Sequence, residues 1–315
     1  MDCVGVQSSG ARTHTNGSLL CLSTQNDFSN YSILHTKPTV TDAESSRELV
    51  IKGGNVNFEK VCFAYDERRP LLGGISSVAE AGKTLAFVGK TGSGKSTILN
   101  LLHRYYDIKD GSITIDDQDI HGVTLSSLRA NIGIVPQKPE MFHRSILENI
   151  RYARLNAKDE EIYEVCMAAA IHDRITTFPD GYNTKVGERG VRLSGGELQR
   201  IAIARVLLRS PKIVILDEAT SAVDTATEAV IQESIEKLSS GRTTIVVAHR
   251  LSTIVRAHNI IVLDDGKIVE QGTHAELIIK KGKYAELWKQ QTAIAKQDEG
   301  AADTSCDAVP ARLAV

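Results

Sequence analysis

Hydrophobic and polar positions along this chain predict two kinds of strand. Residues 55–65 alternate between apolar and polar side chains, and residues 71–80 follow as a second strand. The runs 212–217 and 242–248 are instead apolar almost throughout, which is typical of parallel strands covered on both faces. We therefore expect an antiparallel sheet early in the chain and a buried parallel sheet later.

The stretch from about residue 139 to residue 209 is mostly helical in pattern. Asp159 is predicted to cap an amphipathic segment within it, and Ser194 to cap the run 195–208. Strands alternate with helices in the rest of the chain, so an α/β fold with an inserted α-helical subdomain is expected. Further predicted elements are strands at 112–115 and 132–135, a helix at 225–238, a hairpin across 264–266, and helices at 273–280 and 283–291.

The two ends of the chain lack such patterns. Residues 1–48 are rich in Ser, Thr, Asn and Gln, and are expected to be a disordered or truncated leader. Residues 294–315 are predicted to be a disordered tail. Between them, residues 49–293 are expected to form one domain, with the helical subdomain at about 139–209.

Composition excludes several classes of protein. The chain has 315 residues and a net charge of −2, which gives no indication of a nucleic-acid partner. Its 5 cysteines are scattered without CxxC spacing, so a reducing compartment is expected rather than a disulfide framework or a zinc site. No apolar run reaches the ~18 residues of a membrane span. The chain itself is expected to be soluble.

The strongest chemical signal is the sequence GKTGSGKS at residues 89–96. It follows the apolar run 84–88 and precedes a helical pattern, which is the context of a phosphate-binding loop. Glycines let the backbone wrap around an anion, and the helix N-terminus adds its positive dipole end. Lys95 can then reach the β- and γ-phosphates of a nucleotide, and Ser96 can bind Mg²⁺.

A second carboxylate site follows the buried strand 212–217. Asp217 ends this strand, where ligands bind in open α/β sheets, and Glu218 comes next. One carboxylate can lie in the coordination shell of the metal ion, and the other can act on a water molecule. An acidic surface turn is the alternative interpretation.

Residues 193–200, LSGGELQR, resemble the signature motif of ATP-binding-cassette (ABC) ATPases. The order of phosphate loop, glutamine, signature, Asp-Glu and histidine is also that of an ABC nucleotide-binding domain. The resemblance covers about residues 53–291. It implies a P-loop NTPase (RecA-like) core with an antiparallel β subdomain and an inserted α-helical subdomain.

The resemblance also implies a role for each matching residue. Tyr65 is similar to the aromatic residue that stacks on adenine, although by itself it could be a core strand tyrosine. The implied catalytic residues are Glu218, His249, Gln137 and Lys95. The implied ATP-binding residues are Tyr65, Gly89, Thr91, Gly92, Ser93, Gly94, Lys95, Ser96, Thr97, Ser194, Gly195, Gly196 and Asp224, and the implied Mg²⁺ ligands are Ser96, Gln137 and Asp217. Lys90 departs from the family, which often has a small residue or proline there.

Four further segments resemble the heavy-metal-tolerance half-transporters, which lie beside the mitochondrial ATM-type exporters in the B subfamily. These segments are 113–120, 171–175, 178–182 and 284–288. The resemblance implies a head-to-tail homodimer and a membrane-spanning domain that is supplied by another chain or lost by truncation. It also implies export of thiol-conjugated metals or glutathione-related species, at the cytosolic face of a vacuolar membrane or the matrix face of the mitochondrial inner membrane.

Two other functions remain open at this point. One is a soluble ABC ATPase that works without a membrane domain, although the coiled-coil heptads or duplicated cassette that would favour it are absent from the sequence. The other is a truncated, non-functional fragment of a half-transporter. The intact motifs oppose this second alternative, and the unusual N-terminal stretch supports it.

Overall fold

The computed structural model describes residues 38–187, 190–217, 225–248 and 254–303. The chain divides into two compact units, Met1–Thr41 and Asp42–Val315. Each is taken by itself, and every helix and strand named below belongs to the second unit. Within the described residues, no helix is long and apolar enough to cross a bilayer.

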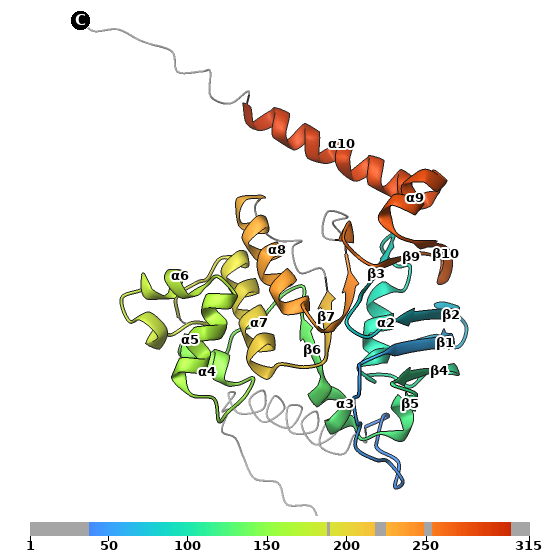
Figure 1. Ribbon diagram of the computed structural model, residues 1–315, viewed down its shortest axis with the longest axis horizontal. Coiled ribbons are helices and arrows are strands. Elements are labelled where there is room, and N and C mark those ends of the chain that lie inside the picture. The colour runs from blue at the N-terminus through green and yellow to red at the C-terminus, as the bar shows by residue number, and fades with distance from the viewer. Residues whose placement is uncertain (1–37, 188–189, 218–224, 249–253, 304–315) are drawn as a thin grey trace, which may run out of the picture. The chain divides into compact units, whose positions relative to one another are not determined.

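Two β-sheets organise the second unit (Figure 1). The smaller sheet is antiparallel with the order β2-β1-β4-β5. The larger has the order β10-β9-β3-β8-β7-β6, in which β9 to β6 run parallel and β10 is antiparallel. The strands are β1 (Val56–Phe63), β2 (Leu72–Ala79), β3 (Thr84–Gly89), β4 (Asp110–Ile115), β5 (Gln118–Asp119), β6 (Ile132–Val135), β7 (Ile213–Asp217), β8 (Thr243–Val247), β9 (Asn259–Asp264) and β10 (Lys267–Gly272). The predicted antiparallel sheet, parallel core sheet and final hairpin are confirmed.

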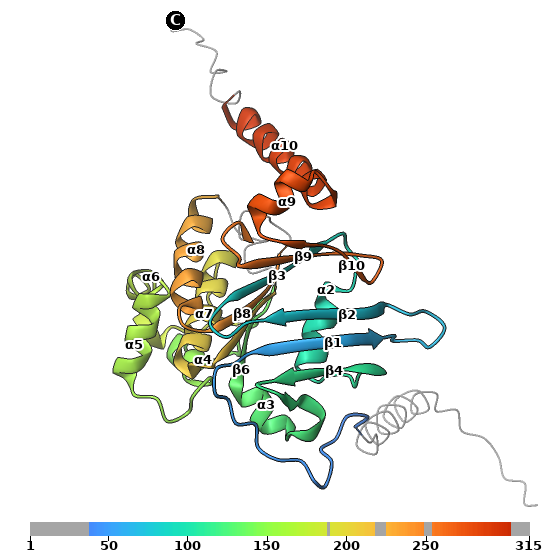
Figure 2. The ribbon, with the colours of Figure 1, turned by 45° about the vertical axis from the view of Figure 1, so that its right-hand side comes forward.

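The helices cover the larger sheet and form a separate group beyond it. They are α2 (Lys95–Leu102), α3 (Leu125–Asn131), α4 (Ile146–Arg151), α5 (Asp159–Ala168), α6 (His172–Thr176), α7 (Gly195–Arg209), α8 (Thr225–Ser239), α9 (His274–Lys280) and α10 (Lys283–Asp303), with 3₁₀ turns η1 (Ile120–Gly122) and η2 (Gly181–Asn183). In both Figure 1 and Figure 2, α4 to α6 lie on the side of α7 that faces away from the smaller sheet.

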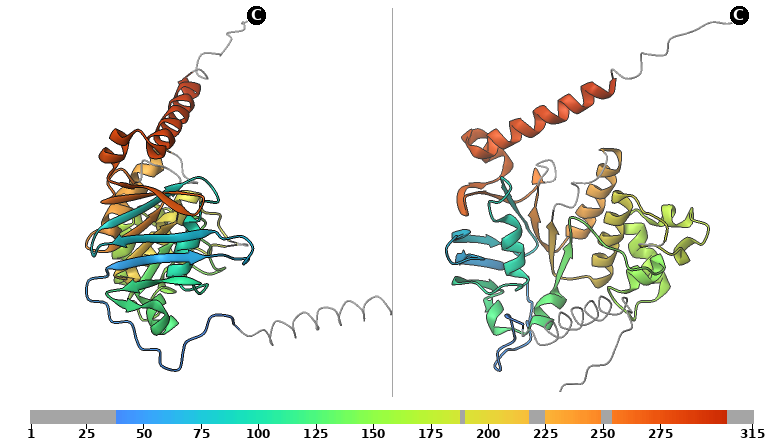
Figure 3. Two further views of the ribbon diagram at one scale, coloured as in Figure 1. Left: turned by 90° about the vertical axis from the view of Figure 1, so that its right-hand side faces the viewer. Right: turned by 180° about the vertical axis from the view of Figure 1, so that it is seen from behind.

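The apolar strands of the larger sheet supply two cores, one on each face. Leu85 and Phe87 of β3 pack with α2 and the smaller sheet, whereas Ala86 and Val88 pack with α7 and α8. Side chains alternate between the faces of a strand, so a strand that is buried on both faces is expected to be apolar at nearly every position, and the buried Thr243 and Thr244 of β8 are polar exceptions. As a result α2 stands between the two sheets, as Figure 3 shows from behind, and α7 lies on the opposite face.

Two predicted helix boundaries differ from the observed ones, and one observed helix was not predicted. Asp159 is the first residue of α5 rather than its cap, because the cap position is Lys158, whose N–H donates to the Glu161 carboxylate. Helix α3 was not predicted, since it offers only seven residues of pattern, although Thr124 caps it through the Ser127 N–H. Helix α10 continues beyond the predicted end near residue 291.

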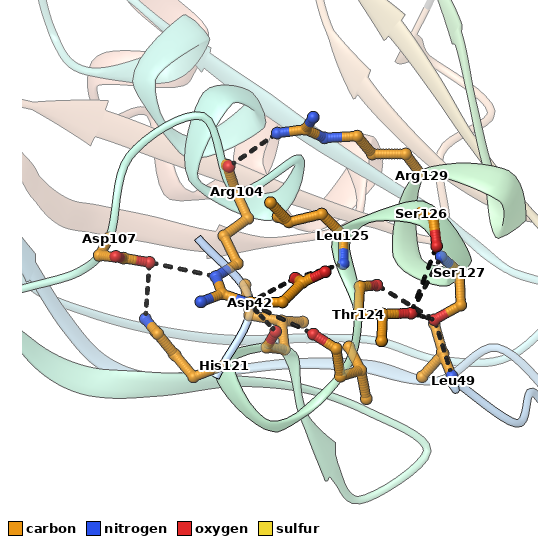
Figure 4. A network of polar contacts seen from close by, with 12 residues as sticks. Asp42, Leu49, Arg104, Asp107, His121, Thr124, Leu125, Ser126, Ser127 and Arg129 are labelled. Carbon is orange, nitrogen blue, oxygen red and sulfur yellow. Dashed lines mark hydrogen bonds and ion pairs between the residues drawn. The ribbon is translucent and has the colours of Figure 1, made fainter. Parts of the chain in front are cut away.

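Residues 42–55, here termed the entry segment, precede β1 and are held by hydrogen bonds to η1, to α3 and to the turn after β4, and Figure 4 shows those to α3. Arg47 pairs with the backbone of Gly122 and Thr124, and the Leu49 N–H donates to Ser127 Oγ at 2.9 Å. The Asp42 carboxylate accepts from the Leu125 N–H at 2.8 Å. These bonds join the start of the domain to α3.

Buried Arg104 braces the same region from the end of α2. Its guanidinium donates to the Asp107 carboxylate at 3.1 Å and to the carbonyl oxygens of Ile120 and Val123 at 3.3 Å. His121 lies 3.4 Å from the same Asp107 oxygen (Figure 4). The Arg104 side chain therefore connects the loop after α2, which carries Asp107, to the η1 turn at Ile120 and Val123.

Asp116 is the main anchor of the entry segment. Its carboxylate accepts backbone N–H bonds from four consecutive residues, Lys52, Gly53, Gly54 and Asn55, at 2.7 to 3.0 Å. Burial raises the pKa of this carboxyl, but the backbone hydrogen bonds outweigh it and hold the pKa below its usual value. The charged form is therefore the one that stabilises the fold.

We predict that Asp116→Asn lowers the free energy of unfolding by about 1–2 kcal/mol, because an amide oxygen replaces a charged acceptor shared by several N–H groups. A folded pKa below the unfolded value adds stability that is present above the unfolded pKa and lost as pH falls through the folded one. The loss in free energy of unfolding caused by Asp116→Asn should therefore be the same at about pH 8 and at about pH 5.

Urea unfolding of the parent chain and the variant at both pH values measures this loss. Asp117→Asn is the matched control, since Asp117 is exposed in the same left-handed turn. Equal effects of the two substitutions would contradict the anchoring role.

Candidate functional site

The phosphate loop connects β3 to α2 and requires glycine at both ends. Gly89 has φ 154°, and a Cβ there would lie 2.2 Å from the Leu263 carbonyl oxygen of the neighbouring strand. Gly94 has φ 100°, and its Cβ would lie 2.5 Å from Leu72 Cδ2. The loop can approach the backbone of β9 this closely only because Gly89 has no side chain, whereas at Gly94 it is the left-handed φ that favours glycine.

The interior of this loop is suited to an anion. Helix α2 begins at Lys95, and its N-cap residue, Gly94, has no side chain that could cap the first N–H groups of the helix. No acidic residue lies in the first turn of α2. The start of this helix can therefore use an anion as its cap. A cavity of about 190 Å³ opens there, lined by Leu71, Thr91, Gly92, Gly94, Lys95, Ser96 and Thr97.

Two polar side chains inside the loop point to the same chemistry. Lys95 is buried, and its ammonium donates to the carbonyl oxygens of Gly89 at 2.8 Å and Lys90 at 2.9 Å. The buried hydroxyl of Ser93 has no hydrogen-bond partner within the described residues. A buried cation and an unsatisfied buried donor are the groups that a phosphate would satisfy.

Tyr65 lies two residues after the end of β1, beside the first turn of α2. Its hydroxyl is 3.3 Å from Thr97 Oγ1, and 55% of the residue is exposed. Phe63 and Tyr106 meet its ring edge-on, with centroids at 4.9 and 5.0 Å. Tyr65 is therefore not a core strand residue, and the exposed part of its ring is available for stacking next to the phosphate loop.

The parallel sheet brings the remaining candidates to the same edge. Asp217 at the end of β7 is level with Val247 of β8, which is level with Phe87 of β3. Val135, the last residue of β6, is paired with Leu216. Because parallel strands end at one edge, the phosphate loop, Asp217 and the Gln137 loop after β6 all lie there. Glu218, Asp224 and His249 lie outside the described residues.

Gln199 is a residue of this region that sequence reasoning missed. It is buried in α7, and its amide donates to the Pro136 carbonyl at 3.2 Å, one residue before Gln137. Helix α7 is thereby linked to the Gln137 loop. A glutamine on the apolar side of a helix was the only signal in the sequence, and a buried polar residue does not by itself show its partner.

The signature residues form the start of α7. Ser194 is the N-cap, as predicted, and its hydroxyl accepts from the Glu197 N–H, while the Glu197 carboxylate accepts from the Ser194 N–H at 2.7 Å. Ser194 and Gly195 are exposed and Gly196 is buried. A hydroxyl can accept one hydrogen bond and donate another, so capping is compatible with binding a phosphate oxygen.

The signature and the phosphate loop belong to opposite faces of the larger sheet. The apolar side of α7 packs with the core that contains Val88, and that of α2 with the core that contains Phe87. The described residues contain no group of three or more His, Cys, Asp or Glu side chains arranged to hold a metal ion. Within the described part of the chain, the candidate residues thus form one group at the sheet edge and a second at the start of α7.

Comparison with known proteins agrees with this geometry. The family model described as "ABC transporter" matches residues 72–221. The chain is 55% identical to the "Heavy metal tolerance protein" of Schizosaccharomyces pombe over 260 residues, which are 82% of this chain and 31% of that protein. It is 48% identical to "ABC transporter B family member 24, mitochondrial" of Arabidopsis thaliana over 266 residues, or 84% of this chain and 39% of that one.

A solved structure shows the same architecture. The structure of a bacterial Atm1-family ABC exporter with ATP bound matches with a TM-score of 0.80 and 45% identity, covering 87% of this chain and 48% of the exporter chain. The present chain spans about a third of the length of the curated relatives it matches. It carries the ATP-binding and ATP-hydrolysing domain of the ABC transporter family, in a form closely related to that of the B-subfamily half-transporters.

Proposed function

We propose that this domain hydrolyses Mg-ATP at sites shared between two copies and thereby drives an exporter. The observation that carries the proposal is the separation of the two ATP-binding groups. Lys95 starts a helix on one face of the larger sheet, and Ser194 caps a helix on the other. A second copy in head-to-tail orientation would supply the missing signature to each phosphate loop.

Each described residue has a definite task in this proposal. The backbone N–H groups from Gly92 to Ser96 and the Lys95 ammonium bind the triphosphate, and Tyr65 stacks on the base. Ser194 of the second copy donates to the γ-phosphate. Fixed donors of this kind stabilise the charge that develops on the transferring phosphoryl group.

Ser96, Asp217 and Gln137 would hold Mg²⁺. The donor set fits this ion, which binds through one or two carboxylates together with phosphate oxygens and water rather than in an all-protein cage. When bound, Mg²⁺ neutralises charge on the phosphates. Glu218 is proposed to polarise the attacking water, and His249 to hold it against the γ-phosphate. Asp224 is proposed to couple the two sites.

The transported species is proposed from the relatives. The cargo is proposed to be thiol-conjugated metals or glutathione-related species, and the similarity to a protein named for heavy metal tolerance supports the metal part of this proposal. The membrane-spanning partner domain would place this domain beside a vacuolar or mitochondrial membrane, and a relative described as mitochondrial supports the second location.

We expect Lys95→Ala to lower ATP hydrolysis at least about a hundredfold, because the phosphates lose a fixed counter-charge. Release of inorganic phosphate by the purified chain measures the effect. Lys90→Ala is the control, since Lys90 is an exposed lysine of the same loop whose described hydrogen bonds use only its backbone. Similar losses in both variants would show that general loop charge, and not the buried ammonium, is responsible.

Tyr65→Ala should weaken ATP binding by about 1–3 kcal/mol, the scale of base–aromatic stacking. Calorimetric titration with ATP gives the affinity. Tyr65→Phe removes only the hydroxyl contact to Thr97 and keeps the ring, so it should bind nearly as well as the parent chain. If the phenylalanine variant binds as poorly as the alanine variant, stacking is not the role of Tyr65.

Glu218→Gln keeps the size of the side chain and removes its charge, so it should bind Mg-ATP while nearly stopping cleavage. The closed dimer should then persist. Size-exclusion chromatography with light scattering is expected to show twice the monomer mass with Mg-ATP and the monomer with ADP. A monomer under both conditions, together with parent ATPase activity that is linear in enzyme concentration, would refute the shared site.

A further inference from the structure

The carboxylate of Glu197, at the start of α7, is held between two donors. One oxygen accepts from the Ser194 N–H at 2.7 Å, and the other accepts from Nε of Arg174 at 2.5 Å. Arg174 belongs to α6, where its guanidinium also lies over the Phe178 ring at 4.8 Å and donates to Thr177 Oγ1 at 3.2 Å. Arg174 of α6 is thus linked to Ser194, the N-cap of α7, through the Glu197 side chain.

The same arrangement, an arginine on a capping-box glutamate, occurs at two other helices of the described chain. Arg144 pairs with Glu148 of α4, and Arg154 pairs with Glu161 of α5. The two glutamate side chains are 47% and 43% exposed, whereas that of Glu197 is 9% exposed. Exposed pairs contribute little, but a buried carboxylate that loses its partner is costly. The pair at α7 is therefore the one on which local structure depends.

The charge state of Glu197 is consistent with this dependence. Burial alone would raise the pKa of the carboxyl, but the hydrogen bonds from Arg174 and Ser194 outweigh it and hold the pKa below its usual range. Glu197 is therefore an anion at neutral pH, and the positive charge beside it comes from Arg174.

We propose that Arg174 is a positioning residue for the shared ATP site. Through Glu197 it fixes the backbone of Ser194, at φ −66° and ψ 160°, and the direction of the first N–H groups of α7. These are the groups that would meet the γ-phosphate held by the other copy. The inference rests on the proposed head-to-tail dimer, and Arg174 itself touches no nucleotide in it.

The positioning role makes a distinctive prediction about binding. Each copy holds ATP mainly through its own phosphate loop, which lies on the other face of the sheet from α7. Removal of Arg174 should leave that first binding step intact. It should weaken only the association of two ATP-loaded copies, because the signature of each then meets the phosphate without a fixed direction. A general loss of structure would impair both steps.

The test uses the full chain in the Glu218→Gln background. We expect Arg174→Ala to raise the dissociation constant of the Mg-ATP dimer by about tenfold or more, the loss expected for one hydrogen bond to a charged group. ATP affinity of the monomer, measured by calorimetry below the dimerisation range, should be unchanged. Arg174→Lys restores a positive charge but not the planar guanidinium that lies over Phe178, so it should recover only part of the dimer affinity.

Two variants serve as matched controls. Arg154→Ala removes the equivalent arginine from the exposed capping box of α5, and Thr177→Ala removes another partner of Arg174 while leaving Glu197 paired. Both should dimerise like the parent. Arg174→Gln is neutral and shorter than arginine but keeps an N–H donor level with Nε, and it replaces the alanine variant if that protein does not fold. A dimer defect with normal monomer binding is expected there too, because the amide leaves the buried carboxylate without a counter-charge.

The outcomes separate the two proposals. If Glu218→Gln alone fails to dimerise with Mg-ATP, both the shared site and the role of Arg174 are overturned. If it dimerises and the Arg174 variants dimerise equally well, only the role of Arg174 is overturned. Loss of monomer ATP binding in the same proportion as dimer affinity would also overturn it, since Arg174 would then support the fold as a whole.

Discussion

The proposed ATP site depends on the parallel pairing of β6, β7, β8 and β3. Parallel strands end at the same edge of a sheet, so the phosphate loop, Asp217 and the Gln137 loop meet although they are far apart in the chain. The pairing is stable because each of these strands is buried on both faces, against α2 and the smaller sheet on one side and α7 and α8 on the other. A polar side chain introduced into these strands without a hydrogen-bond partner would weaken the site without touching it.

The shape of the phosphate loop follows from the same sheet. Strand β9 lies beside β3, and its Leu263 carbonyl occupies the space that a side chain at Gly89 would need. At the other end, Gly94 has φ 100°, a left-handed backbone conformation that favours glycine. The loop therefore keeps its shape only with glycine at these positions, and within it the Lys95 ammonium donates to the carbonyl oxygens of Gly89 and Lys90. Such preorganisation lowers the cost of ordering the site on binding.

The signature end of the domain is organised differently, through side chains. The capping box of Ser194 and Glu197 is local, but its stability in a buried position depends on Arg174 from α6. Gln199 from the same helix bonds to the strand end before Gln137. Helix α7 therefore connects three parts of the domain: the helical group, the signature and the edge of the sheet.

The amino-acid sequence by itself determined the features that depend on neighbours in the chain. Apolar runs predicted the buried strands, the glycine spacing predicted the phosphate loop, and Ser194 was identified as a helix N-cap. These predictions succeeded because the spacing of apolar residues and helix capping depend only on residues one or two turns apart in the chain. Tertiary structure alone decided that Arg174 pairs with Glu197 and that Asp116 anchors the entry segment. From its neighbours in the sequence, an arginine or aspartate that is exposed to water cannot be told from one that makes such a contact. Only the folded chain brings their partners within reach and removes the water that would otherwise replace them.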